Sequence, residues 1–505
     1  MITYHGYSKI RLLNEVFGSR EDISVKKKSG MSWIRYILTI SAAILIIVCI
    51  ALSYIDYEIM DQAKNLYNKP IEWDSSTLIS FNTVQRTKPK PFFIKHPIAK
   101  DLQCAQMYGD NSKEYIQNWI LPNKNVSYAR SRIQYQDEKD LKMDCDSINN
   151  RSYFPVEPRT DFEAKFPLAF VRIVYTDYLF LEMELAASYT PQNSYCYMID
   201  KKADKIFRDR IHNLTKCFPN VIATTREYDV DSAGHNVWPA FIECLYALQK
   251  FEWRYAMTLQ NHDILAKTNY EIAQIFTWFN GANDVEVLNP KMDRIDTNLN
   301  WTFEGLNLFR NASKNLIGAH GLPPKLNWAK GYAESSLSRE MVNFMLIELN
   351  LTTLMRQIEV KSFGIDEIML PTLQATDALD APGGFTHACL DKGKEIFHIT
   401  RYSRWYDNTN CPTQYFRHAI CIFGVEDLES LTKIPSLFIN KFIPTFDFGA
   451  LTCWYERLFN RTYLEEPTEE KLDKNFYLSI PYVRFQYEKL KSNGNFDPQK
   501  FNCTG

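Results

Sequence analysis

An apolar segment near the start of the chain constrains its architecture more than any other feature. Residues 36–55 include no charged side chain and follow a basic cluster of Lys26, Lys27, Lys28 and Arg35. At about 1.5 Å of rise per residue, a helix of this length crosses a hydrocarbon core of about 30 Å. The segment begins too late and runs too long for a cleaved signal peptide. It therefore predicts a single membrane anchor that is retained.

The basic cluster also predicts how the anchor is oriented. Positive residues favour the cytoplasmic side of a membrane, so we expect the long C-terminal part of the chain to be exported. The predicted organisation is a cytoplasmic tail at 1–35, a signal anchor at 36–55, a luminal stem at 56–100 and a luminal domain at 101–505. The Lys-Pro-Lys-Pro run at 88–91 is a stiff, exposed segment within the stem.

The cysteines and the N-glycosylation sequons fit an exported domain. Cys49 lies in the anchor, and the other ten of the 11 cysteines form an even set that suits disulfides in an oxidising compartment. Their spacing lacks the CxxC pairs that are typical of zinc sites. The Asn-X-Ser/Thr sequons all follow the anchor. They begin at Asn125, Asn150, Asn213, Asn300, Asn311, Asn350, Asn460 and Asn502.

Overall composition excludes one class of function and leaves others open. The net charge is -2, and no basic run occurs outside the tail, so nothing indicates nucleic-acid binding. Aromatic residues make up 14% of the chain. That fraction suits stacking on sugars and suits a large packed core equally well.

The exported part begins with the pattern of an α/β fold. A buried strand, a helix and a second strand follow one another within about 35 residues, which is a βαβ unit and implies a parallel sheet. Further apolar runs predict two more strands and another helix. In chain order the predicted elements are strand 168–175, helix 179–187, strand 195–199, strand 220–224, helix 237–250 and strand 253–259.

Polar residues at the ends of these strands are candidates for ligand binding. In open parallel sheets, ligands bind at the carboxyl ends of the strands, where Asp200 and the run 260–263 lie. The chain has neither a P-loop nor a GxGxxG motif. Side chains would therefore have to hold the phosphates of any nucleotide.

A series of short motifs then follows the order seen in one known family. Together, and behind a type II anchor, these motifs over 166–454 resemble the core 2 and I-branching N-acetylglucosaminyltransferase family, whose relatives include proteoglycan xylosyltransferases. The motifs are Phe166-Pro-Leu-Ala, Met198-Ile-Asp-Lys-Lys-Ala, Trp253-Arg-Tyr, Asp263 with Lys267-Thr-Asn, Asp366-Glu, Arg401-Tyr-Ser-Arg-Trp, Cys421-Ile-Phe-Gly-Val-Glu-Asp-Leu and Leu437-Phe-Ile-Asn-Lys-Phe.

The resemblance implies a fold, an activity and a location. The expected fold is similar to GT-A glycosyltransferases, with an open, Rossmann-like, mostly parallel sheet. The expected reaction is an inverting, metal-independent transfer of N-acetylglucosamine from UDP-GlcNAc in β1,6 linkage onto an O-glycan or lactosamine-type acceptor. The expected location is the Golgi membrane, with the catalytic domain in the lumen, and a homodimer is left open. The alternatives are a xylosyl- or other sugar transferase of the same fold and an inactive luminal glycan-binding protein.

Glu367 matches the catalytic base of the family. An inverting transfer needs one carboxylate that takes the proton from the attacking sugar hydroxyl. The polar pair Asp366-Glu367 opens an apolar stretch, so the alternative is a role at a helix start, where acids are favoured. We expect Glu367 to be the base and Asp366 to cap the helix.

The resemblance also implies a donor site and an acceptor site. Lys441 and Arg417 match cations that neutralise the departing diphosphate, with His418 as an alternative to Arg417. Asp200 aligns with an aspartate at the uracil end of the donor, or else is a strand-end turn residue. Ser232 replaces a family tyrosine near the nucleotide. The matches to acceptor-contacting positions are Glu286 and Trp405.

Two further expectations concern metals and disulfides. Asp-X-Asp sequences occur at 229–231 and 144–146, but the strand 253–259 ends in a run with only one carboxylate, so we expect loop residues and no metal. Family positions imply four disulfides, whereas Cys389 and Cys503 have no family partner and either pair or stay free. The implied disulfides are Cys104–Cys453, Cys145–Cys217, Cys196–Cys244 and Cys411–Cys421.

Overall fold

The computed structural model describes residues 91–109, 111–120, 132–406, 410–492 and 494–504. The predicted tail, the predicted anchor at 36–55, the stem up to residue 90 and the sequon asparagine Asn125 lie outside the described residues. None of the helices within the described ranges combines the length and the apolar character needed to cross a membrane.

The main sheet is built around β1 (Leu168–Val174), every residue of which is buried. Strands β2 (Ser194–Ile199) and β4 (Tyr255–Leu259) pair with β1 on its two sides, and both run parallel to it. β3 (Val221–Ala223) adds a further parallel strand beyond β2, while β6 (Ser336–Ser338) is antiparallel to β4. The strand order is β3-β2-β1-β4-β6, which confirms the predicted α/β class with a mostly parallel sheet.

The predicted βαβ unit is present at the centre of this sheet. α5 (Tyr178–Ser188) connects β1 to β2, and the pairing of Val174 with Ile199 brings the carboxyl ends of both strands to the same edge. α7 (Val237–Ala247) matches the helix predicted at 237–250 and continues as a 3₁₀ turn, Leu248–Lys250. The elements from 168 to 259 therefore follow the prediction, except for the helix Lys205–Cys217, which was not predicted.

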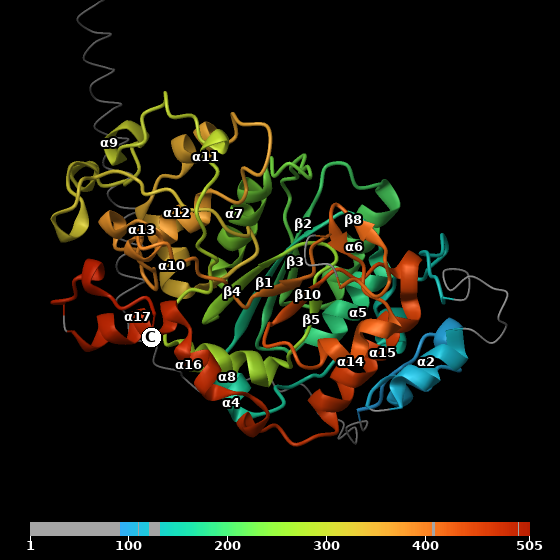
Figure 1. Ribbon diagram of the computed structural model, residues 1–505. Helices are drawn as coiled ribbons and strands as arrows, with labels where there is room; N and C mark the ends of the chain where they lie inside the picture. Colours follow the sequence, from blue (N-terminus) through green and yellow to red (C-terminus); the bar gives the residue numbers. More distant parts are fainter. Residues whose placement is uncertain (1–90, 110, 121–131, 407–409, 493, 505) are drawn as a thin grey trace, which may run out of the picture. The chain divides into compact units, whose positions relative to one another are not determined.

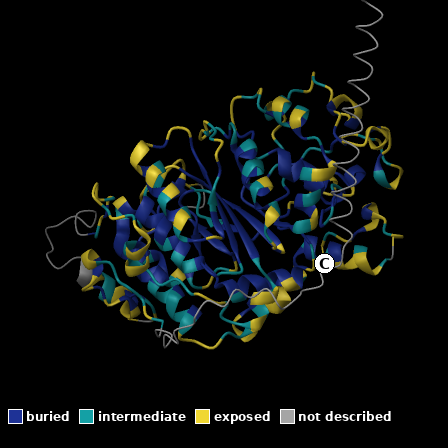
Figure 2. Ribbon diagram, turned by 180° about the vertical axis from the view of Figure 1, so that it is seen from behind, coloured by how far each residue is buried: buried dark blue, intermediate teal, exposed yellow. Residues whose placement is uncertain are grey.

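The side chains of β1 alternate between two hydrophobic cores, one on each face of the sheet. Phe170 and Val174 enter one core, and Val171 and Ile173 enter the other. This alternation follows from the period of two residues in a strand. Figure 1 shows helices on both sides of the central strands, and Figure 2 shows that these strands are buried.

Helices from distant parts of the chain cover the two faces. The core around Phe170 is completed by α5, α6 (Lys205–Cys217), α8 (Asn269–Phe279), α14 (Leu428–Leu431), α15 (Pro444–Tyr463), α16 (Lys474–Ser479) and α17 (Pro481–Lys491). The core around Val171 is completed by α7, α9 (Phe303–Leu306), α10 (Arg339–Asn343), α11 (Thr352–Ile358) and α12 (Met369–Ala375). The remaining α-helices of the described chain are α2 (Ser112–Ile120), α3 (Cys145–Arg151), α4 (Asp161–Lys165) and α13 (Ala388–Asp391).

A second, smaller sheet adjoins the carboxyl ends of the main strands. It has the order β5-β10-β7, formed by β5 (Ile264–Leu265), β10 (Phe438–Asn440) and β7 (Arg401–Ser403). β10 is antiparallel to β5 and parallel to β7. A short hairpin joins β8 (Phe416–Arg417) to β9 (Ile420–Cys421). These short strands position most of the cations described below.

The cysteines of the described residues form five disulfides. The four that the resemblance implied are confirmed: Cys104–Cys453, Cys145–Cys217, Cys196–Cys244 and Cys411–Cys421. Cys389 and Cys503, which the sequence left open, form the fifth pair and connect α13 to the C-terminal segment. All described sequon asparagines are at least partly exposed, so each is accessible for modification.

Candidate active site

The carboxyl ends of the main strands form the candidate site, as expected for an open parallel sheet. Asp200 follows β2 directly and is only 4% exposed. Its backbone N–H donates to the carbonyl of Val174, and one of its carboxylate oxygens accepts from the N–H of Lys202 at 2.8 Å. The predicted strand-end position of Asp200 is thus confirmed, and its role toward a ligand stays a prediction.

The single carboxylate after β4 is already engaged in internal hydrogen bonds. Asp263 accepts from the backbone N–H of Gln260 at 2.6 Å and from the side-chain amide of Asn440 at 2.8 Å. Asp229 and Asp231 are loop residues, as predicted, and pair with Lys202 and His235 at 2.5 and 2.8 Å. The described residues include no group of three side chains that could hold a metal ion.

Lys441 and Arg417 lie in one region of positive charge. Lys441 follows β10, and Arg417 ends β8. Burial, together with the nearby cations Arg401 and Arg417, lowers the pKa of Lys441 to about 8. The alternative residue, His418, lies in the same field, since burial, Lys441 and Arg417 lower its pKa. The carboxylates of Asp263 and Glu334 offset part of this positive charge. Neighbouring cations of this kind attract an anion, and we call Lys441 and Arg417 the cation pair.

Tyr175 follows β1 directly and lies close to both Arg417 and Asp200. Burial raises the pKa of the Tyr175 hydroxyl, Arg417 opposes that shift by its charge and a hydrogen bond, and Asp200 adds to it. Three predicted donor residues, Asp200, Arg417 and Lys441, therefore surround one end of the sheet. Ser232, the other predicted donor residue, is exposed in the loop before α7. The next residue, Ala233, accepts through its carbonyl from the N–H of Gly364 at 2.7 Å.

The catalytic and acceptor residues predicted from the sequence line one cavity of about 680 Å³. We call it the Glu367 cavity. Glu286, Glu367 and Trp405 all contribute to its wall, although they are far apart in the sequence. A concave site with a few convergent polar groups is typical of small-ligand binding. Arg401 also lines the cavity and influences the pKa of Lys441, so the cavity adjoins the cation pair.

Glu367 lies just before α12, and its carboxylate faces cations. Arg294 and Lys330 form ion pairs with it, the second at 3.5 Å. The first helical position of α12 is Met369, and the residue that precedes it, Ile368, provides no side-chain cap. The expectation that Asp366 caps this helix is therefore wrong. A capping role also fails to explain Glu367, whose carboxylate lies at the cavity wall in ion pairs with Arg294 and Lys330.

Two neighbouring carboxyl groups are desolvated. Burial is the main cause that raises the pKa of Glu286 to about 7, with Glu367 adding to the shift and Lys330 opposing it. Burial likewise raises the pKa of Asp366 to about 7, helped by the charges of Glu334 and Glu367. Of these two residues, Glu286 lines the Glu367 cavity and Asp366 does not. A carboxyl group with a raised pKa in a cavity is common at functional sites, because burial disfavours the charged form.

Several contacting residues were not predicted from the sequence. The Trp405 indole N–H donates to the hydroxyl of Tyr332, and the Arg401 guanidinium lies 4.7 Å from the ring centroid of Tyr332. Arg401 also pairs with the buried Glu334 at 2.7 Å. Arg401 belonged to a recognised motif, but no local pattern distinguished Arg294, Lys330, Tyr332 or Glu334, because the tertiary fold alone brings them together.

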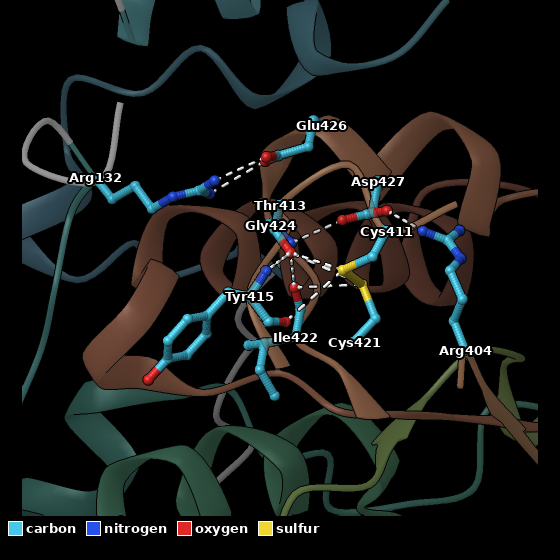
Figure 3. The surroundings of a disulfide bond; sticks show 10 residues. All are labelled: Arg132, Arg404, Cys411, Thr413, Tyr415, Cys421, Ile422, Gly424, Glu426 and Asp427. Carbon is cyan, nitrogen blue, oxygen red and sulfur yellow. Dashed lines mark hydrogen bonds and ion pairs between the residues drawn. A yellow bond between two sulfur atoms is a disulfide. The ribbon is translucent and has the colours of Figure 1, made fainter. Parts of the chain in front are cut away.

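The loop that presents Arg417 is closed by the disulfide Cys411–Cys421 (Figure 3). Beside it, the hydroxyl of Thr413 donates to the carbonyl of Ile422 at 2.6 Å. Arg404 pairs with the buried Asp427 at 2.6 Å, which anchors the following turn. These interactions fix both ends of the hairpin β8–β9, so the position of Arg417 depends on them.

Comparison with known proteins supplies independent information. The family described as "Core-2/I-Branching enzyme" matches residues 168–432. A relative from Homo sapiens, "Beta-1,3-galactosyl-O-glycosyl-glycoprotein beta-1,6-N-acetylglucosaminyltransferase", is 26% identical over 76% of this chain and 92% of its own length. A similarly named protein from Mus musculus, with the suffix 3, is 25% identical over 72% and 84%. The human "N-acetyllactosaminide beta-1,6-N-acetylglucosaminyl-transferase" is 28% identical over 62% and 78%.

Among solved structures, the mannosyltransferase Ktr4p from S. cerevisiae is similar over 54% of this chain and 81% of that chain, with 12% identity. The TM-score of 0.23 is too low for this likeness to support an argument. The family match, in contrast, spans more than half of the chain and includes β1, the carboxyl ends of the strands, Glu367 and Arg417. The chain belongs to the Core-2/I-Branching enzyme family.

Proposed function

We propose that this chain is an inverting glycosyltransferase that moves N-acetylglucosamine from UDP-GlcNAc in β1,6 linkage onto a galactose- or GalNAc-bearing glycan. The observation that supports it most directly is the placement of Glu367. Its carboxylate lines a cavity large enough for a sugar, and that cavity adjoins the cation pair through Arg401. A base on one side and cations on the other are what a displacement with an anionic leaving group requires.

The proposed mechanism is a single displacement. An acceptor hydroxyl oxygen attacks the anomeric carbon of the donor sugar while the bond from that carbon to the diphosphate breaks. Glu367 takes the hydroxyl proton, and Lys441 and Arg417 stabilise the negative charge that develops on the departing UDP. Glu286 and Trp405 hold the acceptor, by hydrogen bonds to its hydroxyl groups and by stacking respectively. One displacement inverts the configuration at the anomeric carbon.

Metal independence is part of this proposal. Asp263 is the only carboxylate in the turn after β4, and Gln260 and Asn440 already occupy its oxygens. The charge that a metal would supply comes instead from the cation pair. Transfer should therefore persist in excess EDTA, with no gain from added manganese. Loss of transfer in chelator that manganese restores would contradict metal independence.

We further propose a GT-A-like enzyme in the Golgi lumen, anchored by residues 36–55. Five disulfides support an oxidising compartment, since such bonds are rare in the cytosol. The accessible sequons are consistent with the same compartment. Confocal localisation and glycosidase-sensitive mobility of the full-length chain would test this part separately from the chemistry.

A donor panel tests the activity itself. The purified full-length chain is assayed with UDP-GlcNAc, UDP-xylose and UDP-galactose against a Galβ1,3GalNAc acceptor and a lactosamine acceptor. The expected result is β1,6-linked product from UDP-GlcNAc, and at least about 100-fold slower transfer in a Glu367→Gln variant. Preference for UDP-xylose would favour a xylosyltransferase. Binding of acceptor without transfer from any donor would favour an inactive glycan-binding protein.

A further inference from the structure

A second hollow lies beside the Glu367 cavity and has no part in the chemistry proposed above. Its volume is about 520 Å³. Apolar, aromatic and neutral amide side chains make up most of its lining, and we call it the tryptophan hollow. The residues that define it are Met292, Trp301, Trp328, Asn289, Asn327 and His387.

The two spaces share a wall. Residues from the segments 286–294 and 325–332 line both of them. The backbones of Leu288 and Lys330 exchange two hydrogen bonds across this wall, of 2.8 and 3.0 Å. Leu288 and Lys330 line the Glu367 cavity, whereas the neighbouring Asn289 lines the tryptophan hollow. The two spaces therefore lie next to each other, on either side of this pair of backbone hydrogen bonds.

A single helical turn contributes to both spaces. The 3₁₀ turn Met292–Arg294 carries Met292, which is 51% exposed, in the tryptophan hollow. Two residues later, Arg294 pairs with the carboxylate of Glu367. The hollow is thus tied to the group that we propose as the base, through two residues of one turn.

The chemistry of the hollow suits a neutral sugar. The rings of Trp301 and Trp328 meet edge to face, with centroids 4.7 Å apart at 87°. The Trp301 indole N–H donates to the carbonyl of Asp296 at 2.8 Å, which fixes that ring. Aromatic faces pack on the C–H groups of a sugar, while Asn289 and Asn327 offer amides to its hydroxyl groups. The lining residues, all within the described chain, include one lysine, Lys325, and no carboxylate.

We propose that the tryptophan hollow is a second sugar subsite, which holds a distal residue of an extended acceptor glycan while the reacting sugar lies in the Glu367 cavity. This inference rests on the proposed function and adds to it a preference for acceptors longer than a disaccharide. Its lining includes Lys325 but none of the residues assigned above to proton transfer or to the diphosphate, so its contribution is to affinity and to acceptor choice.

The test compares acceptors of two lengths on purified full-length protein. Trp328→Ala and Met292→Ala are assayed with UDP-GlcNAc, a disaccharide acceptor and a tetrasaccharide that extends the same disaccharide. We expect kcat/KM for the tetrasaccharide to fall about tenfold in Trp328→Ala and less in Met292→Ala, mainly through KM. For the disaccharide we expect a change of less than about twofold. Tyr246→Ala, which removes a 72% exposed ring on α7, is the matched control.

Several results would overturn the proposal. Equal losses with both acceptors would assign Trp328 a structural role, and Met292→Ala, whose side chain is exposed, guards against a folding artefact. A loss that follows the peptide carrier rather than the glycan length would assign the hollow to a peptide. Asn300 belongs to the sequon that contains Trp301. If Asn300→Gln abolishes the preference for the longer acceptor, the hollow is assigned to the protein's own N-linked glycan at Asn300. Failure of wild type on every acceptor would count against the proposed function itself, which the donor panel detects independently.

Discussion

The guanidinium of Arg294 forms an ion pair with the carboxylate of Glu367. The same guanidinium lies 3.4 Å from the carbonyl oxygen of Gly364, and a Cβ at residue 364 would collide with it. Gly364 has a φ of +65°, a left-handed conformation that glycine adopts without steric cost. Arg294 therefore orients Glu367 through a backbone arrangement that no other residue at 364 would permit without strain.

The first prediction concerns the proposed base. Glu367→Gln keeps the size of the side chain and its hydrogen bonds but cannot accept a proton in the transition state. Transfer should fall by roughly 10²–10⁴, the usual contribution of general base catalysis, with UDP affinity little changed. Steady-state kinetics and calorimetric titration with UDP measure the two effects. Near-wild-type turnover in a folded Glu367→Gln protein would remove the mechanism but leave the fold intact.

Local sequence patterns predicted the four parallel strands of the main sheet but not its antiparallel strand β6. The strand β1 is an apolar run interrupted only by Arg172, and α7 is a longer apolar segment that follows polar turn residues, so both could be recognised without a structure. The strands β5, β7 and β10 could not, because each has two or three residues and gains its conformation from its neighbours. Short strands of this kind have no periodicity to detect.

The candidate site was predicted only in part, because local sequence does not show which distant residues the fold brings together. Glu367 and Lys441 were identified through resemblance to a family, and the structure places both near the carboxyl ends of the sheet. The partners of Glu367 were not predicted: Arg294 is 73 residues away in sequence and Lys330 is 37 away. The wrong prediction, a cap by Asp366, came from reading Asp366-Glu367 as a helix start when α12 begins two residues later.

The second prediction follows from the pKa of Lys441, which burial and the neighbouring cations lower to about 8. Lys441 is charged below this pH and loses its proton as the pH rises through it, so the attraction for a diphosphate weakens on the alkaline side. Affinity for UDP should therefore be highest near pH 6–7 and decline above about pH 8. Titration calorimetry from pH 6 to 9.5 measures the decline.

Two variants of Lys441 separate charge from position. Lys441→Ala should lower both donor affinity and turnover and should abolish most of the alkaline decline, because the titrating group is gone. Lys441→Arg keeps a charge at every accessible pH and should flatten the decline while retaining part of the affinity. An unchanged alkaline decline in Lys441→Ala would show that another group titrates.

The third prediction concerns the disulfide Cys411–Cys421, which closes the loop that presents Arg417. This disulfide has the smallest sequence separation of the five, 10 residues, against 349 for Cys104–Cys453. Loop-closure entropy grows with separation, so its removal should cost the least stability. Replacing both cysteines by serine should lower UDP affinity by more than it lowers Tm, relative to the same change at Cys104 and Cys453. A larger Tm loss at Cys411 and Cys421 would contradict this order.

The fourth prediction uses the buried carboxyl of Glu286. Burial raises its folded-state pKa from the ordinary value of 4.5 to about 7. The folded protein therefore binds this proton more tightly than the unfolded chain, so the associated stability is present below pH 4.5 and is lost as the pH rises to 7. Above pH 7 the ionised group destabilises the fold by about 3 kcal/mol, the equivalent of the shift.

Glu286→Gln removes the ionisation but keeps the shape and the hydrogen-bonding capacity of the side chain. Tm should therefore rise at pH 8, where wild type carries the buried charge, and stay close to wild type at pH 5, where much less of it is ionised. Glu304→Gln, at an exposed position on α9, should change Tm at neither pH. An equal effect of Glu286→Gln at both pH values would refute the role of desolvation. The same variant should also raise the KM for the acceptor, because Glu286 is proposed to bind the acceptor hydroxyl groups. A higher KM together with a higher Tm at pH 8 would show that the buried carboxylate lowers stability but contributes to acceptor binding.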